Sequence, residues 1–152
     1  MDNEMLRRFF EFDGWANQEA SRSLETMANP PERAVALLGH IAATQRVWLE
    51  RAHSKALSVA LWPPWSLSEI AKQLPATLDE WIHLIATDDL SRDFAYTNTK
   101  GQQFRSRLSD VGLHVAFHGV YHRGQIAALV RQHGGKPADT DFIVAVRTGA
   151  VK

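Results

Sequence analysis

The chain has 152 residues, no cysteine, and 17 basic against 17 acidic side chains. This length is typical of one domain, which we expect to cover residues 1–152. Without cysteine, the chain forms no disulfide, thiolate zinc finger or iron–sulfur cluster. A formal net charge of zero argues against a broad nucleic-acid or anionic-membrane surface. No apolar run approaches the roughly 18 residues of a membrane span, and no signal peptide is recognisable, so we expect a cytoplasmic protein.

The first two segments have the apolar spacing of helices. Residues 3–27 place apolar side chains about every 3.6 residues, which predicts one helix with one buried stripe. Pro30 and Pro31 separate it from a second predicted helix over residues 31–53. His40 lies on or beside the apolar stripe of this second helix, so we expect its imidazole to be buried.

The next stretch, residues 61–65, reads Leu-Trp-Pro-Pro-Trp and cannot be regular helix. It predicts a long connection. Ser66 and Glu69 have the spacing of a capping box, so a third helix is expected from Ser66 to about Ile85. Pro75 falls inside that helix, where we expect either a kink or a division into two helical pieces.

The last third of the chain changes character twice. Residues 93–107 predict a short β-hairpin with its turn near Gly101. A final long helix follows over residues 108–133, with Gly134 after its end. Residues 142–146 are too few for another bundle helix, so we expect a tail or a strand. The fold class predicted is all-α: a four-helix bundle with a long connection between helices 2 and 3 and a hairpin before the last helix. An irregular all-α domain is the alternative.

Three of the seven histidines, His114, His118 and His122, follow one another at intervals of four residues. Side chains four apart lie on one face of a helix, so two neighbouring imidazoles can reach one metal ion. All three cannot, because the outer two are about 12 Å apart along the axis. One of the three must lie outside the coordination sphere, and another ligand must come from a different helix. His40 is the best candidate for it, whereas His53, His83 and His133 are predicted to be solvated.

The run from His114 to Ile126 resembles the H-x-x-x-H-x-x-x-H-R-G-Q signature of the DinB family of small four-helix-bundle proteins, which includes the YfiT-like proteins. The resemblance extends along nearly the whole chain. Trp15-Ala16-Asn17 is similar to the family's first helix, and Gly39-His40-Ile41 is similar to its second-helix histidine segment. It implies a divalent metal held by His40, His118 and His122, with His114 beside the site or simply buried. It also implies a homodimer.

Imidazole ligands suit several metals, so we expect zinc or nickel first and iron or copper next. Three protein ligands and an open position are typical of a catalytic site rather than a structural one. Some family members transfer thiols, so the expected function is a metal-dependent enzyme acting on a small molecule, thiol S-transferase-like or hydrolase-like. A low-molecular-weight thiol is one candidate substrate. The alternative is a non-catalytic stress-response protein with a structural metal. Neither a nucleic-acid nor a membrane partner is expected.

Three further side chains are candidate neighbours of the metal or of an adjoining pocket: His114, Gln125 and Gln45. Gln125 lies on the same face as His122 and is positioned to orient a ligand. Gln45 stands where an acidic residue is expected in many relatives, which would make the site less anionic. No catalytic residue is assigned. The acidic side chains Glu11, Asp13 and Glu50, and also Arg123, are interpreted as surface groups.

Overall fold

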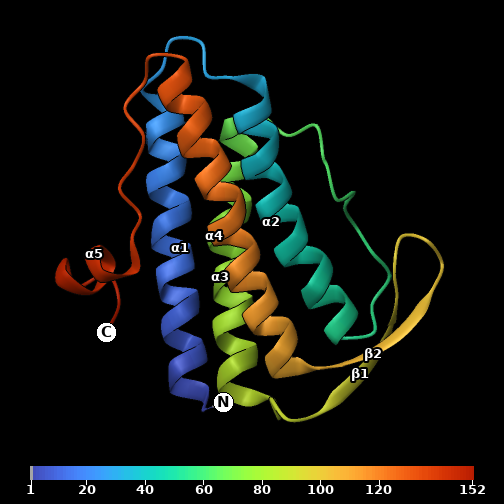
Figure 1. Cartoon of the computed structure of the whole chain (residues 1–152). Coiled ribbons are helices and arrows are strands. Elements are labelled where there is room, and N and C mark those ends of the chain that lie inside the picture. Colours follow the sequence, from blue (N-terminus) through green and yellow to red (C-terminus); the bar gives the residue numbers. More distant parts are fainter. Residues whose placement is uncertain (1) are drawn as a thin grey trace.

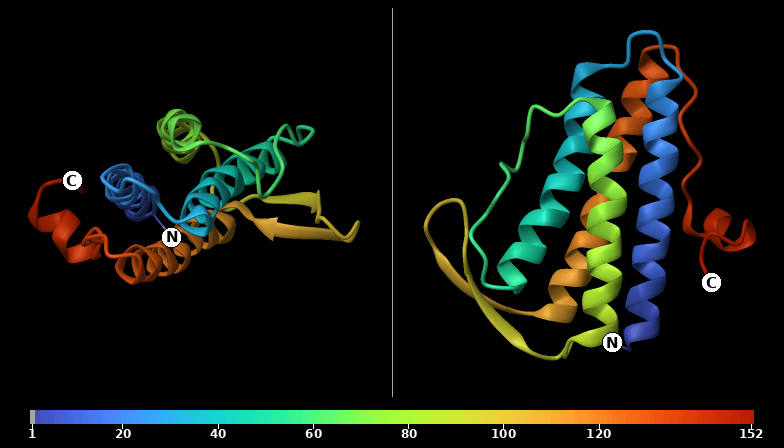
Figure 2. Two further views of the ribbon diagram at one scale, coloured as in Figure 1. Left: turned by 90° about the horizontal axis from the view of Figure 1, so that it is seen from above. Right: turned by 180° about the vertical axis from the view of Figure 1, so that it is seen from behind.

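The computed structural model describes residues 2–152. Within them the chain is mostly helical, with one small antiparallel sheet. The elements in order are α1 (Asn3–Glu25), α2 (Glu32–Ala52), α3 (Leu67–Thr87), β1 (Asp93–Thr97), β2 (Gln103–Arg107), α4 (Leu108–Gln132) and α5 (Phe142–Arg147). The four long helices lie alongside one another (Figure 1). The hairpin and α5 project on opposite sides of them (Figure 2).

Side chains next to the helix ends explain where the helices begin and stop. The Asp2 carboxylate accepts a hydrogen bond from the Met5 amide at 2.7 Å and caps α1. The Ser66 hydroxyl accepts one from the Glu69 amide, which confirms the predicted start of the third helix. After α4, Gly134 has φ +78°, a left-handed conformation that favours glycine and ends the helix as predicted.

Apolar side chains from all four long helices form the core. The largest group of buried apolar side chains contains Phe10 of α1 and Trp81 of α3. Their rings stack with centroids 4.8 Å apart, and both are fully buried. Most apolar residues of the stripes predicted for the first and second helices are also buried, among them Leu6, Leu24 and Ile41. Helix α4 packs against both α1 and α2, and this places its inner face within reach of His40.

The third helix continues through Pro75 without interruption, so the division into two pieces is wrong. Pro75 and Ala71 both lie on the exposed side of α3, and water can therefore satisfy the Ala71 carbonyl that loses its N–H partner. The kink remains a prediction.

The segment after α4 was predicted to be a tail or a strand, and the strand is wrong. Residues 142–146 belong to the short helix α5 rather than to a strand. A strand needs an edge to pair with, and the hairpin, the one sheet in residues 2–152, lies on the other side of the molecule. The tail instead packs against α1, where Phe142 meets Phe12 edge-on with centroids 5.2 Å apart.

The hairpin and the long connection are confirmed. Strands β1 and β2 pair antiparallel, with Tyr96 opposite Phe104. The turn contains Gly101 at φ +76°. Residues 53–66 form no regular helix or strand and run along the outside of α2 (Figure 2). No helix in residues 2–152 is both long and apolar enough to cross a bilayer.

Candidate metal site

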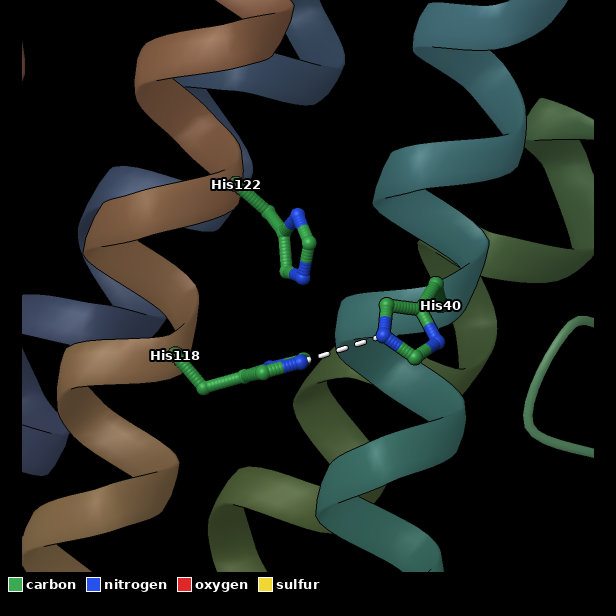
Figure 3. A group of neighbouring side chains, drawn as sticks. All are labelled: His40, His118 and His122. Atoms are coloured by element: carbon green, nitrogen blue, oxygen red, sulfur yellow. Dashed lines mark hydrogen bonds between the residues drawn. The ribbon is translucent and has the colours of Figure 1, made fainter.

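Three imidazoles from two helices converge on one point between α2 and α4. They belong to His40 of α2 and to His118 and His122 of α4, and one ring nitrogen of each lies within 4.8 Å of the other two (Figure 3). The Nε2 atoms of His40 and His118 are 3.1 Å apart. The structure thus brings together the three residues that the family resemblance implies, and they could hold a metal ion.

Local helix geometry and burial explain this convergence. His118 and His122 are four residues apart on α4, which places their ring centroids 4.4 Å from each other. His40 is 9% exposed and faces α4 from the buried stripe of α2. Its ring centroid is 4.8 Å from that of His118 and 4.9 Å from that of His122.

Two of the three rings are oriented by acceptors outside the cluster. The His40 Nδ1 atom donates to the Leu61 carbonyl at 2.7 Å. The His122 Nδ1 atom donates to the Gln125 side-chain oxygen, also at 2.7 Å. A carbonyl can only accept, so in each neutral ring Nδ1 carries the proton and Nε2 keeps its lone pair. Such partners beyond the ligands are the usual way in which proteins orient metal-binding imidazoles.

The surroundings keep the imidazoles of His40 and His118 neutral. Burial, followed by the neighbouring histidines, lowers the pKa of His118 to about 3. Burial also lowers the pKa of His40, against an opposing contribution from its hydrogen bond to Leu61. No carboxylate is among the groups that shift either pKa. Neutral imidazole is the form that binds a metal, so both rings are ready to bind one at neutral pH.

The separation of the His40 and His118 nitrogens fits a divalent ion. Metal–nitrogen bonds of about 2.0–2.1 Å place two ligand nitrogens roughly 2.9 Å apart at an octahedral angle and about 3.3 Å apart at a tetrahedral one. The 3.1 Å between His40 and His118 lies between these values. Three imidazole nitrogens also match the ligand type of known histidine-bound zinc sites.

His114 is not part of the cluster. It lies on the exposed side of α4, with its ring centroid 5.8 Å from that of His118 and 5.7 Å from Trp48. Of the two places expected for His114, the buried one is therefore wrong, whereas a place beside the three-histidine group and outside it agrees with the distance to His118 and with the spacing argument. His53, His83 and His133 are exposed, as predicted.

Gln45 lies in the core and belongs to a different polar group. Its amide nitrogen donates to Asp13, and its oxygen accepts from the Thr77 hydroxyl at 3.0 Å. Asp13 in turn pairs with Arg123, and both side chains are almost completely buried. The interpretation of Asp13 and Arg123 as surface groups is wrong, because each neutralises the other across the α1–α4 interface.

The same correction applies to Glu50, whose carboxylate is buried and accepts hydrogen bonds from the Ser58 amide and hydroxyl. Sequence reasoning also missed the Leu61 carbonyl and Trp62, which contact His40 from the connection. The two prolines after Trp62 indicate a connection with little backbone freedom. The spacing of residues does not indicate that this connection contacts His40.

Comparison with known proteins agrees with this geometry. A model described as the DinB family matches residues 11–148, more than half of the chain. This chain belongs to the DinB family. Protein DinB from Bacillus subtilis (strain 168) is 27% identical to it, in an alignment that covers 89% of this chain and 90% of that protein. The histidine cluster of this DinB-family chain lies within the matched region, on the two helices that carry its H-x-x-x-H-R-G-Q and G-H-I segments.

Proposed function

We propose that this DinB-family chain binds one divalent metal ion through His40, His118 and His122. The observation that carries the proposal is that His40 and His122 each have Nδ1 committed to an outside acceptor, which leaves Nε2 available within the cluster. Zinc or nickel is the expected ion, then iron or copper. We also infer that the four long helices form one four-helix-bundle domain over residues 1–152.

The proposed activity is that of a metal-dependent enzyme acting on a small molecule, by thiol S-transfer or by hydrolysis. Three protein ligands leave a coordination position for a molecule from outside, which is the arrangement of catalytic rather than structural zinc sites. When bound, the ion would supply Lewis acidity and lower the pKa of a coordinated water or thiol. The chain's own part is to hold and orient the imidazoles through Leu61 and Gln125, as described above.

A non-catalytic stress-response protein is the second candidate. The observation in its favour is that the cluster joins α2 to α4, so a bound ion would cross-link two helices. Only the enzyme requires a substrate, and a low-molecular-weight thiol is the one proposed. A change in the visible spectrum of the cobalt-substituted protein on addition of such a thiol would support the enzyme, because the thiol must reach the ion to cause it.

Metal content is the test of the proposed site. The untagged wild-type protein, purified without chelator, is compared by inductively coupled plasma mass spectrometry with His40→Ala, His118→Ala, His122→Ala and His114→Ala. We expect about one equivalent of metal in the wild type and in His114→Ala, the matched control from the same face of α4, and its loss in the other three. A wild type that stays metal-free in excess zinc or nickel would refute the proposal.

We also infer a homodimer, and a surface for it. Phe117, Val120 and Tyr121 form an apolar face of α4 and are 60%, 47% and 67% exposed. Three large apolar side chains within two turns are unusual on a surface that only water covers. The expected cytoplasmic location and the expected lack of a nucleic-acid partner remain predictions.

A further inference from the structure

We propose that Trp62 is a positioning residue for the metal ligand His40. The connection between α2 and α3 would then orient one of the three ligands of the site. This inference rests on the proposed metal site. It adds that the site is organised from outside the two helices that supply its ligands.

The contact between the two side chains is a face-to-face stack. The ring centroids of His40 and Trp62 are 3.9 Å apart and the ring planes differ by only 3°. The indole therefore covers one face of the imidazole and fixes the plane in which it lies. Trp62 is also close to His122, at 6.4 Å between centroids, so it borders the cluster rather than a single ligand.

Leu61, the residue before Trp62, restricts the rotation of the His40 ring within its own plane. A stack alone lets an imidazole turn within its plane, whereas the hydrogen bond from Nδ1 to the Leu61 carbonyl stops that rotation. Two consecutive residues of the connection thus define both the plane of the His40 ring and the direction of its Nε2 atom. That direction is toward His118 (Figure 3).

Arg33 contributes to holding the indole in place. Its guanidinium carbon is 4.7 Å from the Trp62 ring centroid. Arg33 and His40 are seven residues apart on one face of α2, about 10.5 Å along the axis, a gap that accommodates one ring between the two side chains. Cation–π attraction between the guanidinium and the indole therefore helps to keep the Trp62 ring beside α2.

The connection is fastened to α2 before Trp62 and lies against α2 after it. Before it, the Ser58 amide donates to the buried Glu50 carboxylate at 2.9 Å. After it, the Pro63 carbonyl oxygen lies beside Gly39, at ordinary van der Waals distance from the position that a Cβ would take there. Gly39 is the residue next to His40. The segment that carries Leu61 and Trp62 is thus held beside the turn of helix that carries the ligand.

Trp62 is not a core residue. Its side chain is 45% exposed, whereas Trp81 in the core is fully buried. It packs with none of the three groups of buried apolar side chains in residues 2–152, and its ring contacts a histidine and an arginine instead. A tryptophan placed in this way contributes orientation to His40 more than core packing.

The test measures zinc affinity by competition with a chromophoric chelator. Trp62→Ala removes the stack and Trp62→Phe keeps an aromatic face. Trp65→Ala is the matched control, since Trp65 belongs to the same connection but packs against the buried apolar group that contains Leu37 and Ile70. We expect zinc affinity to fall about tenfold or more in Trp62→Ala and to stay within about threefold of the wild type in Trp62→Phe and Trp65→Ala.

A second measurement needs no metal. Long-range ¹H–¹⁵N spectra of the metal-free protein report which nitrogen of His40 carries the proton. We expect the Nδ1–H form in the wild type and a mixture of the two forms in Trp62→Ala, with thermal melts confirming that the variant is folded. An unchanged form together with an unchanged zinc affinity would overturn the inference. A wild type that shows the Nδ1–H form but binds no metal would instead refute the proposed function and leave the positioning role of Trp62 standing.

Discussion

His118 gains no proton within the range of pH in which most proteins are stable, because its pKa is about 3 in the folded chain against an ordinary 6.5. Below pH 6.5 the unfolded chain takes up a proton that the folded chain does not. The metal-free protein should therefore lose stability as the pH falls from 6.5 toward 3 and show no such loss above 6.5. We expect about 1 kcal/mol less stability at pH 5, a value reduced for the partial exposure of the ring.

Urea unfolding of the chelator-treated protein at several pH values checks this. In His118→Gln the position cannot titrate, so the unfolding free energy of the wild type should fall relative to that of the variant as the pH is lowered. A difference that is constant from pH 7 to pH 4 would contradict the pKa assigned to His118.

Gln125 tests the orientation of His122 at the other end of the cluster. Its amide oxygen accepts the proton of His122 Nδ1. Gln125→Leu removes that acceptor and should weaken zinc binding by about tenfold, because the ring is then free to turn and to change tautomer. Gln125→Glu, which offers a stronger acceptor, should bind zinc at least as tightly as the wild type. Equal affinities in the wild type and in Gln125→Leu would show that this hydrogen bond has no effect on the site.

At the scale of single residues, prediction from sequence worked where the cause is local. The spacing of His118 and His122 follows from the helix repeat, and the place of His40 follows from its neighbours on an apolar stripe. Arg123 was misjudged because its partner, Asp13, is 110 positions away. The residues next to a charged side chain do not indicate that it forms an ion pair with another helix. They also do not indicate that a backbone carbonyl such as that of Leu61 accepts a hydrogen bond from a metal ligand.

Between elements, the contact of α1 with α4 depends on a glycine. A Cβ on Gly119 would overlap Asp13 Oδ1 and lie 2.7 Å from Arg123 Nη1. Gly119→Ala should therefore destabilise the protein by about 3 kcal/mol or more, since it separates a buried ion pair. Gly124 lies on the same helix in open space, so Gly124→Ala should raise stability by about 0.5–1 kcal/mol.

Chemical denaturation of the two glycine variants is the measurement. Their effects should have opposite signs although the substitution is identical. A Gly119→Ala protein as stable as the wild type would mean that the helices move apart without loss and that the ion pair is not under steric control.

Element boundaries were predicted well where a cap or a proline defines them, as at Ser66 and Gly134. The tail was predicted less well. Residues 142–146 are all apolar and three of them, Ile143, Val144 and Val146, are β-branched, which favours a strand in isolation. The choice between a strand and α5 was decided by what lies beside the tail, namely the aromatic side chains of α1 and no sheet edge. Sequence alone does not contain that information.

For the whole molecule, a bound ion should add stability by linking α2 to α4. Zinc at 100 times its dissociation constant should stabilise the folded chain by about 2.7 kcal/mol and raise the melting temperature by roughly 5–10 °C. His114→Ala should retain this rise and His122→Ala should lose it. Differential scanning calorimetry with and without zinc checks both, and a rise that persists in His122→Ala would place the ion elsewhere.

Self-association is the second property at this scale. Tyr121→Glu places a charge in the middle of the exposed face formed by Phe117, Val120 and Tyr121. If this face forms the proposed homodimer, the variant should be monomeric by light scattering coupled to size-exclusion chromatography, while the wild type should have twice the mass of one chain. An exposed control, Tyr121→Phe, should remain dimeric. A wild type that is already monomeric at high concentration would refute the dimer.

The distribution of the ligands along the chain has a consequence for the order of assembly. His118 and His122 meet as soon as one turn of α4 forms, whereas His40 must be brought back across 78 residues. A chain that is not yet folded can therefore hold an ion weakly through two imidazoles of a nascent helix, and the third arrives only with tertiary structure. Metal captured early would bias the collapse of the chain toward the native pairing of α2 with α4. The ion would then act as a guide to folding before it takes part in any chemistry.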